Sequence, residues 1–317
     1  MTHACTPRSR SDDLNQAALP GRAAFKPYAY RMDGPNLLVA SMSTPLPRGA
    51  DGYLWQYHSR SDTHSKVACW GIMYDLLQHS DVLREHVTSG KVVFGINFEI
   101  NDFVHHRKKN LDLVIARPQH GVASSGETRT FASLTDAWSI QLTPDQRRRL
   151  DMLPVFVEGA FGANAVLLAL EAKACMTAHS KAGPRLFDEL NSSHQIIHAA
   201  SERALAVGFV MINSASTFLS PDMNRRRSYT EADHVSEHKQ PAAAQTAMRR
   251  VESLPTRSGA SGHGYDGIAA ITVDMPNDGT RVRLDTRPPA PSASSPYHYG
   301  SMISRVANEY DGRFSGI

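Results

Sequence analysis

The stretch AVLLALEAK, residues 165–173, decides the fold, because it is an apolar run that carries two charges near its end. In an extended strand Glu171 and Lys173 point to one face, while Leu168, Leu170 and Ala172 point to the other. Burying a carboxylate or an ammonium is costly unless the charge is paired or binds a metal. The stretch therefore predicts a core strand with a functional acid and base on one face.

A second apolar run with one internal acid precedes it. The stretch KKNLDLVIA, residues 108–116, places Asp112 within a predicted strand. Mg²⁺ is typically held by one or two carboxylates together with water and phosphate oxygens, and Asp112 and Glu171 supply two. A lysine beside the ion, here Lys173, can orient or help deprotonate the attacking water and offset charge on the phosphate. The three side chains predict hydrolysis of a phosphodiester bond.

This arrangement resembles the PD-(D/E)xK nuclease superfamily, whose signature is an Asp on one strand and Glu-x-Lys on the next. The signature here reads Asp112 and Glu171-Ala172-Lys173, with Leu111 where the family has Pro. The resemblance implies a restriction-endonuclease-like fold and a DNA substrate. It also implies Mg²⁺ as cofactor, with Mn²⁺ as a substitute, bound by Asp112, Glu171 and the Ala172 backbone carbonyl. Lys173 is then the catalytic base or charge stabiliser.

The order of the predicted elements follows the same family. Apolar spacing predicts a helix over 64–86, strands over 91–96, 111–116 and 165–173, a helix opened by Pro184, and a strand over 206–212. The result is an α/β protein with a central mixed sheet flanked by helices in the order αβββαβ. Residues of about 118–163 form an insertion between the second and third core strands, with short helices over 133–138 and 144–150.

The remaining segments divide the chain into three parts. Residues 1–50 are expected to form a flexible N-terminal arm, because they are rich in Ser, Arg, Pro and Ala without a sustained period. The nuclease core is expected over 51–220. Residues 221–317 are expected to form a peripheral C-terminal region with a helix, a hairpin over 268–284 and a short terminal helix.

Basic residues supply candidates for phosphate contacts. The net charge of +3 is too mild to prove a polyanionic partner, but basic triplets occur at 107–109, 147–149 and 225–227. The first precedes Asp112, which makes Arg107, Lys108 and Lys109 substrate-binding candidates; a solvated face is the alternative for each triplet. Further candidates follow the Glu-x-Lys strand, with a polar loop or a core edge as their alternative: Thr177, His179, Lys181, His194 and Gln195.

Composition sets broad limits. Three scattered cysteines predict neither a disulfide framework nor a zinc cluster, and no run reaches the ~20 apolar residues of a membrane helix. Without an apolar N-terminal signal, a cytoplasmic location is expected. We expect a metal-dependent endonuclease, with a type II-like restriction enzyme as the favoured role and a homodimer left open. Alternatives are a phage, mobile-element or repair nuclease, a catalytically silent nucleic-acid-binding or structural protein, and an α/β protein with a coincidental E-x-K.

Overall fold

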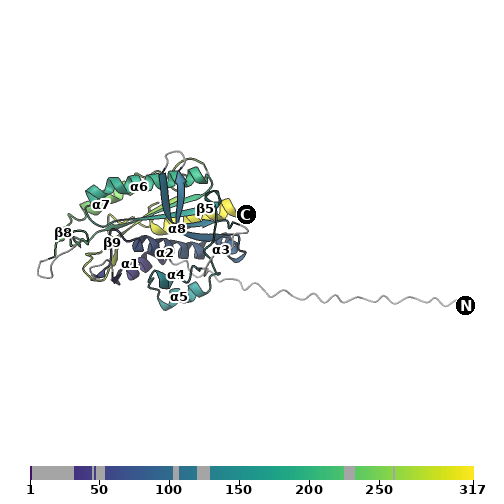
Figure 1. Cartoon of the computed structure of the whole chain (residues 1–317), viewed down its shortest axis with the longest axis horizontal. Coiled ribbons are helices and arrows are strands. Elements are labelled where there is room, and N and C mark those ends of the chain that lie inside the picture. The colour runs from purple at the N-terminus through teal and green to yellow at the C-terminus, as the bar shows by residue number, and fades with distance from the viewer. Residues whose placement is uncertain are drawn as a thin grey trace. The chain divides into compact units, whose positions relative to one another are not determined.

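A sheet of six strands in the order β10-β9-β6-β5-β4-β3 organises the chain (Figure 1). The computed structural model describes residues 1, 32–44, 46–47, 54–102, 107–119, 129–224, 233–259 and 261–317. The sheet strands are β3 Val93–Asp102, β4 Arg107–Ala116, β5 Val166–Cys175, β6 Leu205–Asn213, β9 Gly267–Asp274 and β10 Arg283–Asp285. Two small pairs lie outside the sheet: β1 Leu46–Pro47 with β2 Leu54–Trp55, and β7 Thr217–Leu219 with β8 Val235–Glu237.

The sheet is mixed. β3, β4 and β5 pair antiparallel, β5, β6 and β9 pair parallel, and β10 is antiparallel to β9. Parallel neighbours need a crossover connection, which α6 His179–Ala200 provides between β5 and β6, and α7 Ala242–Glu252 provides part of the next one. The predicted α/β class and the order αβββαβ are both confirmed.

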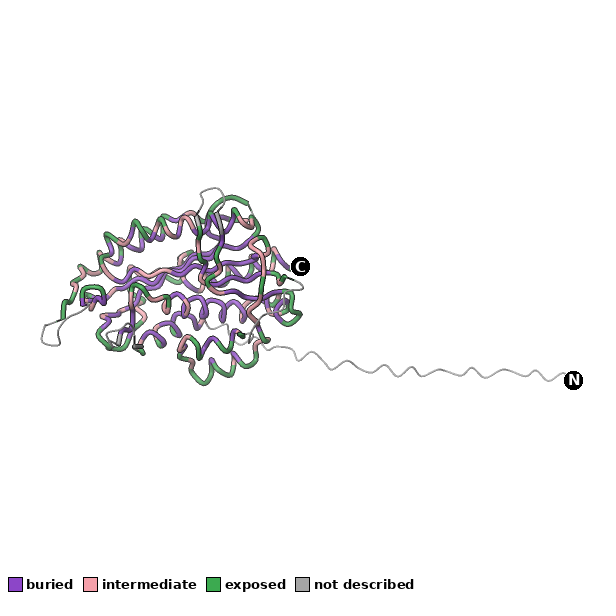
Figure 2. The backbone as a smooth tube through the Cα atoms, viewed as in Figure 1, coloured by how far each residue is buried: buried purple, intermediate pink, exposed green. Residues whose placement is uncertain are grey.

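Helices cover both faces of the sheet (Figure 1). α1 Gly34–Met42, α2 Thr63–His79, α3 Asp81–Thr88 and α8 Tyr299–Phe314 share a core with one face, and α6 and α7 share a core with the other. Figure 2 shows the buried residues concentrated along the sheet and the helix faces that meet it. β6 is buried along its whole length, as expected for a strand covered on both sides.

The predicted helix over 64–86 is two helices. α2 ends at His79 because Ser80 adopts an extended conformation with φ −107° and ψ 112°. The Ser80 hydroxyl then accepts the backbone N–H of Leu83 and caps α3. An N-cap serine inside an apolar pattern is therefore the local reason for the break.

Pro184 does not open a helix, as the sequence pattern predicted, but lies inside α6. The helix begins at His179, after Ala178 in the left-handed conformation with φ 49°. The Ala178 carbonyl accepts the N–H groups of Lys181 and Ala182, so the first turn is already formed before Pro184 is reached. Pro184 still lies in the second turn, where the proline costs one backbone hydrogen bond.

The C-terminal region is part of the central sheet rather than peripheral. The predicted hairpin forms as β9 and β10, but β9 also pairs along β6, and α8 packs over it through Ile303 and Val306. The physical reason is that β9 is apolar on both faces and completes the open side of β6. Similarly, the region predicted as an arm contains α1, whose Leu37 and Leu38 are each 1% exposed.

The insertion contains the two predicted short helices, α4 Leu134–Ala137 and α5 Pro144–Asp151. Thr143 and Gln146 form a capping box at the start of α5. Hydrogen bonds anchor the insertion to α2, among them those from Trp70 Nε1 to the Phe131 carbonyl and from the Tyr74 hydroxyl to the Gln146 carbonyl. Among the described residues, no helix is both long enough and apolar enough to span a membrane.

Candidate functional site

The β3–β4 hairpin changes faces at one point. Ile96 and Leu113 pair with each other and pack on the α2 side of the sheet. The next pair along the hairpin, Phe98 and Leu111, packs on the α6 side. Between them Asn97 has φ 49°, a left-handed conformation that is uncommon outside glycine and reverses the alternation of side chains. The far end of the hairpin therefore bends toward α6.

Asp112 lies at this bend, where β4 separates from β5. The ladder between the two strands ends at the pair of Leu113 and Leu170. The Asp112 side chain continues the contact, because its Oδ2 accepts the backbone N–H of Ala172 at 2.8 Å. The N–H and C=O of one strand residue point to the same neighbouring strand, so the Ala172 carbonyl also faces the Asp112 side. The Ser65 hydroxyl, in the first turn of α2, donates to the Asp62 carbonyl at 2.9 Å and lies near enough to Asp112 to lower its pKa.

Glu171 is the most buried charge of the site, at 1% exposure. Its Oε1 lies 2.8 Å from Lys173 Nζ and 3.7 Å from Lys109 Nζ. Neither carboxylate oxygen has a hydrogen-bond partner of good geometry among the described residues. Two ammonium groups therefore balance the charge of Glu171 without saturating its oxygens.

Lys109 reaches Glu171 because the hairpin bends toward α6. Its ammonium donates to the Glu189 carbonyl at 2.7 Å and to Ser192 Oγ at 3.3 Å, both on α6. Burial lowers the pKa of Lys109 despite the nearby Glu171. Burial also acts to lower the pKa of Lys173, but the nearby negative charges, that of Glu171 first, outweigh it and the pKa is raised. Lys173 is accordingly held as a cation.

Two effects raise the pKa of Asp112 to about 6. Burial is the larger, and the negative charge of Glu171 is the second. The Ala172 N–H, the Lys173 charge and the Ser65 hydroxyl act in the opposite direction. A carboxyl whose pKa is raised by a second carboxylate marks a place where a cation would be stabilising.

The donor set fits one divalent ion. Asp112 and Glu171 are close enough to affect each other, and Glu171 presents two buried oxygens without hydrogen bonds. Mg²⁺ commonly binds one or two carboxylates and completes its shell with water and phosphate oxygens. Within the described part of the chain no group of three His, Cys, Asp or Glu side chains is placed to hold a metal. Among the described residues, Asp112 and Glu171 therefore offer two carboxylates and not a closed all-protein metal cage.

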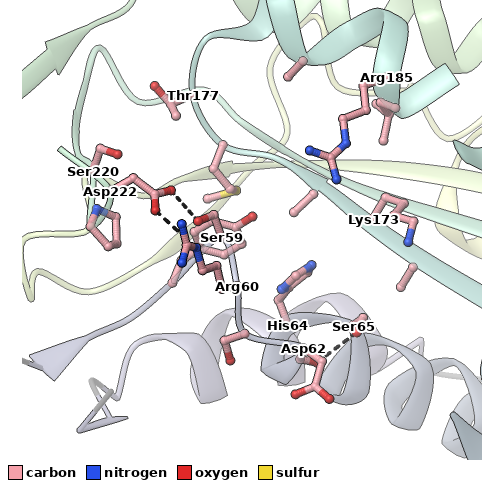
Figure 3. A pocket seen from close by; sticks show the side chains of 18 of the residues that line it. Ser59, Arg60, Asp62, His64, Ser65, Lys173, Thr177, Arg185, Ser220 and Asp222 are labelled. Carbon is pink, nitrogen blue, oxygen red and sulfur yellow. Dashed lines mark hydrogen bonds and ion pairs between the residues drawn. The ribbon is translucent and has the colours of Figure 1, made fainter. Parts of the chain in front are cut away.

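A cavity of about 480 Å³ opens beside these groups, between the N-terminal turn of α2, the end of β5 and α6. Asp112, Ala172 and Lys173 line it. Figure 3 shows Lys173 and Arg185 on the right side of the cavity and Thr177, Ser220 and Asp222 on the left. The candidate catalytic groups thus lie at one end of a larger pocket.

The basic run before Asp112 does not form one surface in the described residues. Lys108 is exposed and pairs with Glu99 Oε1 at 2.8 Å. Lys109 points inward to Glu171, so the alternation of strand side chains separates the two lysines. Arg107 belongs to β4, but its side chain lies outside the described residues, as does the whole triplet at 225–227.

The other substrate-binding candidates lie in different places: at the cavity, in the core and on the exposed face of α6. Thr177 lines the cavity and hydrogen-bonds His238 Nε2 at 3.0 Å. His179 is 3% exposed and its Nε2 donates to the Asn213 carbonyl at 2.9 Å. His194 is 1% exposed, and burial lowers its pKa to about 4, so it lies in the core between the sheet and α6. Two further candidates are exposed on α6 and outside the cavity lining: Lys181 and Gln195.

Sequence reasoning missed three residues that contact the site. Ser65 lowers the pKa of Asp112, Glu189 Oε2 lies 3.8 Å from Lys173 Nζ, and Arg185 Nε lies 2.7 Å from Glu189 Oε1. Arg185 and Glu189 are spaced i, i+4, which in a sequence is typical of an ordinary exposed helix pair. Their role is visible only once α6 is placed over the end of β5.

Comparisons of the chain with protein-family models, with curated proteins and with solved structures give no match. The chemistry of the site is therefore argued from its own residues.

Proposed function

We propose that this chain is a Mg²⁺-dependent nuclease of the PD-(D/E)xK type, with a restriction-endonuclease-like core, that hydrolyses DNA phosphodiester bonds. The observation that carries the proposal is the convergence of Asp112, Glu171 and Lys173 where β4 separates from β5. Asp112 comes from the second strand of the antiparallel meander and the pair of Glu171 and Lys173 from the third, with Glu189 of α6 beside Lys173.

Each residue has a defined part in this proposal. Asp112 and Glu171 hold the ion, with the Ala172 carbonyl facing the same gap. When bound, the ion supplies a Lewis acid and a template for the phosphate and the water. Lys173, 28% exposed and lining the cavity, is the charge stabiliser rather than the base, since Glu171 keeps it protonated. Its ammonium orients the attacking water and offsets negative charge on the phosphate.

Lys109 supports the site without facing the cavity. It ties α6 to β4 through the Glu189 carbonyl and lies 3.7 Å from the Glu171 carboxylate. Lys173 lines the cavity, whereas Lys109 does not. We infer that Lys109 acts through Glu171 and not on the phosphate. Lys109 is therefore not one of the phosphate-binding residues that the sequence led us to expect.

The test is divalent-metal-dependent cleavage of plasmid DNA by the full chain and by Asp112→Asn, Glu171→Gln and Lys173→Met. Each substitution should lower the rate by about 10³-fold or more, because each removes a metal ligand or a preorganised charge. DNA binding should largely persist, since affinity comes mainly from phosphate contacts elsewhere. Lys108→Met, on the exposed face of β4, is the matched control. Full activity in any of the three variants would contradict the assignment.

The neighbouring genes bear on the biological role of the proposed nuclease. We propose a restriction role, and a DNA methyltransferase gene beside this one would support it. An integrase or recombinase gene in that place would instead favour a mobile-element nuclease.

A further inference from the structure

The catalytic groups lie deep. Glu171 is 1% exposed and Ala172 2%, and Asp112 is only partly exposed. Asp112, Ala172 and Lys173 meet solvent at the cavity, which they line together. A phosphate that reaches Lys173 therefore enters the cavity with part of the nucleotide attached to it.

The opposite end of the cavity has the chemistry of a nucleoside site. Its wall is apolar and aromatic, formed by Tyr57, Met176 and Phe218, which are 9%, 3% and 1% exposed. The rings of Tyr57 and Phe218 lie edge to face with centroids 6.3 Å apart. Polar side chains rim this wall, among them Thr177 and Asp222 (Figure 3). An apolar, aromatic wall with hydrogen-bonding groups at its edge suits a base, which has an apolar face and a polar edge.

Two loops border this end and are tied together. The Ser59 hydroxyl donates to Asp222 Oδ2 at 2.5 Å, and Arg60 Nε lies 3.8 Å from Asp222 Oδ1. These contacts join the segment before α2 to the segment after β7. The cavity volume of about 480 Å³ lies in the range of about 300–1,000 Å³ typical of small-molecule sites.

From these features we infer that the cavity takes one nucleotide out of the base stack, with its base against Tyr57 and Phe218 and its phosphate at Lys173. The substrate is therefore single-stranded or frayed DNA, since a base paired within a stacked duplex cannot enter a pocket of this size without being extruded. This inference rests on the proposed nuclease function and names its substrate class.

The experiment compares a single-stranded oligonucleotide with the blunt duplex of the same sequence. Cleavage with Mg²⁺ is measured for both, and binding is measured with Ca²⁺ in place of Mg²⁺ by fluorescence anisotropy. 2-Aminopurine within the single strand reports unstacking by a rise in its fluorescence. We expect the single strand to be bound and cut at least about tenfold better, as loss of one base–aromatic contact and the cost of extrusion each amount to about that factor.

A pair of matched variants tests the cavity itself. Ala182→Leu places a larger side chain at the cavity wall, whereas Ala199→Leu makes the same change on the exposed face of the same helix. We expect Ala182→Leu to lower single-strand affinity about tenfold and to remove the 2-aminopurine signal, with Mn²⁺ affinity unchanged. Ala199→Leu should behave as the unmodified chain.

The outcomes separate this inference from the proposed function. Equal cleavage of duplex and single strand, or an Ala182→Leu variant that binds single strands normally, would overturn the inference and leave the nuclease standing. Cleavage of neither DNA with Mg²⁺ or Mn²⁺ would overturn both.

Discussion

Lys109 on β4 lies 3.7 Å from Glu171 Oε1 on β5, and Lys173 lies 2.8 Å from the same oxygen. Two ammonium groups thus share one buried carboxylate. Lys109 is fixed there by the Glu189 carbonyl and Ser192 of α6. Its positive charge orders Glu171, but the same charge opposes a divalent cation at that carboxylate.

Lys109→Met is therefore expected to raise Mn²⁺ affinity by about tenfold or more while lowering stability by about 1 kcal/mol, through loss of its hydrogen bonds to α6. Titration calorimetry with Mn²⁺ and urea denaturation measure the two effects. Lys109→Gln, which keeps a donor but not the charge, should raise Mn²⁺ affinity with a smaller loss of stability. Lys108→Met should change neither. Unchanged Mn²⁺ affinity in both Lys109 variants would show that the charge does not act on the metal ligands.

The sequence contained enough to predict β5 and its two charges, because alternation over nine residues is a local signal. The bend at Asn97 is not local. Nothing marks an asparagine as left-handed in advance, yet this residue turns Lys109 toward Glu171 and places Asp112 in the gap beside Ala172. Prediction of the acids was possible from the pattern, whereas their arrangement depended on this bend.

A similar limit applies to the C-terminal region. The hairpin of β9 and β10 was predicted from its turn, where Asn277 and Gly279 have φ 63° and 91°. The pairing of β9 with β6 joins residues far apart in the chain, and no local periodicity encodes such a partner. Non-local strand pairing was therefore the part of the fold that the sequence did not reveal.

The pKa of about 6 for Asp112 predicts an acid limb in the activity profile. Metal binding needs the ionised carboxylate, so cleavage should rise with pH through about 6 and level off above it. The rate at limiting metal, measured from about pH 5 to about pH 8, tests this. High metal concentration should move the limb to lower pH, because the ion competes with the proton. A flat profile would contradict the role of Asp112.

The same raised pKa of Asp112 makes the metal-free protein more stable at low pH than at high pH. The folded-state pKa of Asp112 is raised above the ordinary value of 3.8, so the folded protein retains a proton that the unfolded chain releases. Asp112 then favours folding below about pH 4, and this contribution is lost as pH rises to about 6. Asp112→Asn should weaken this dependence, which urea denaturation in EDTA at several pH values measures.

Ser65 should affect the pH at which cleavage activity falls on the acid side of the profile. Its hydroxyl, which donates to the Asp62 carbonyl, also lies near the Asp112 carboxylate and lowers the pKa of Asp112. Ser65→Ala is expected to raise the Asp112 pKa and shift the acid limb to higher pH, with little change in the plateau rate. Ser89→Ala, at an exposed helix end, is the control. A lower plateau with an unmoved limb would instead assign Ser65 a purely structural role.

Asp75 on α2 predicts a second pH effect, away from the catalytic groups. It is fully buried, and its carboxylate accepts the N–H groups of Asp33 and Gly34 and the Tyr299 hydroxyl, the last at 2.8 Å. Burial raises its pKa to about 7 from the ordinary value of 3.8. Its contribution to stability is therefore greatest below about pH 4 and is lost as pH rises toward 7.

Tyr299→Phe removes a donor that favours the charged form of Asp75. We expect a loss of about 1–3 kcal/mol in the free energy of unfolding, larger at about pH 8 than at about pH 5, because only the ionised carboxylate depends strongly on that donor. Tyr297→Phe is the matched control, since the Tyr297 hydroxyl bonds the Glu252 carbonyl at the surface. Urea denaturation of both variants at the two pH values measures the difference. An equal loss at both pH values would mean that the Tyr299 hydroxyl stabilises packing rather than the charge of Asp75.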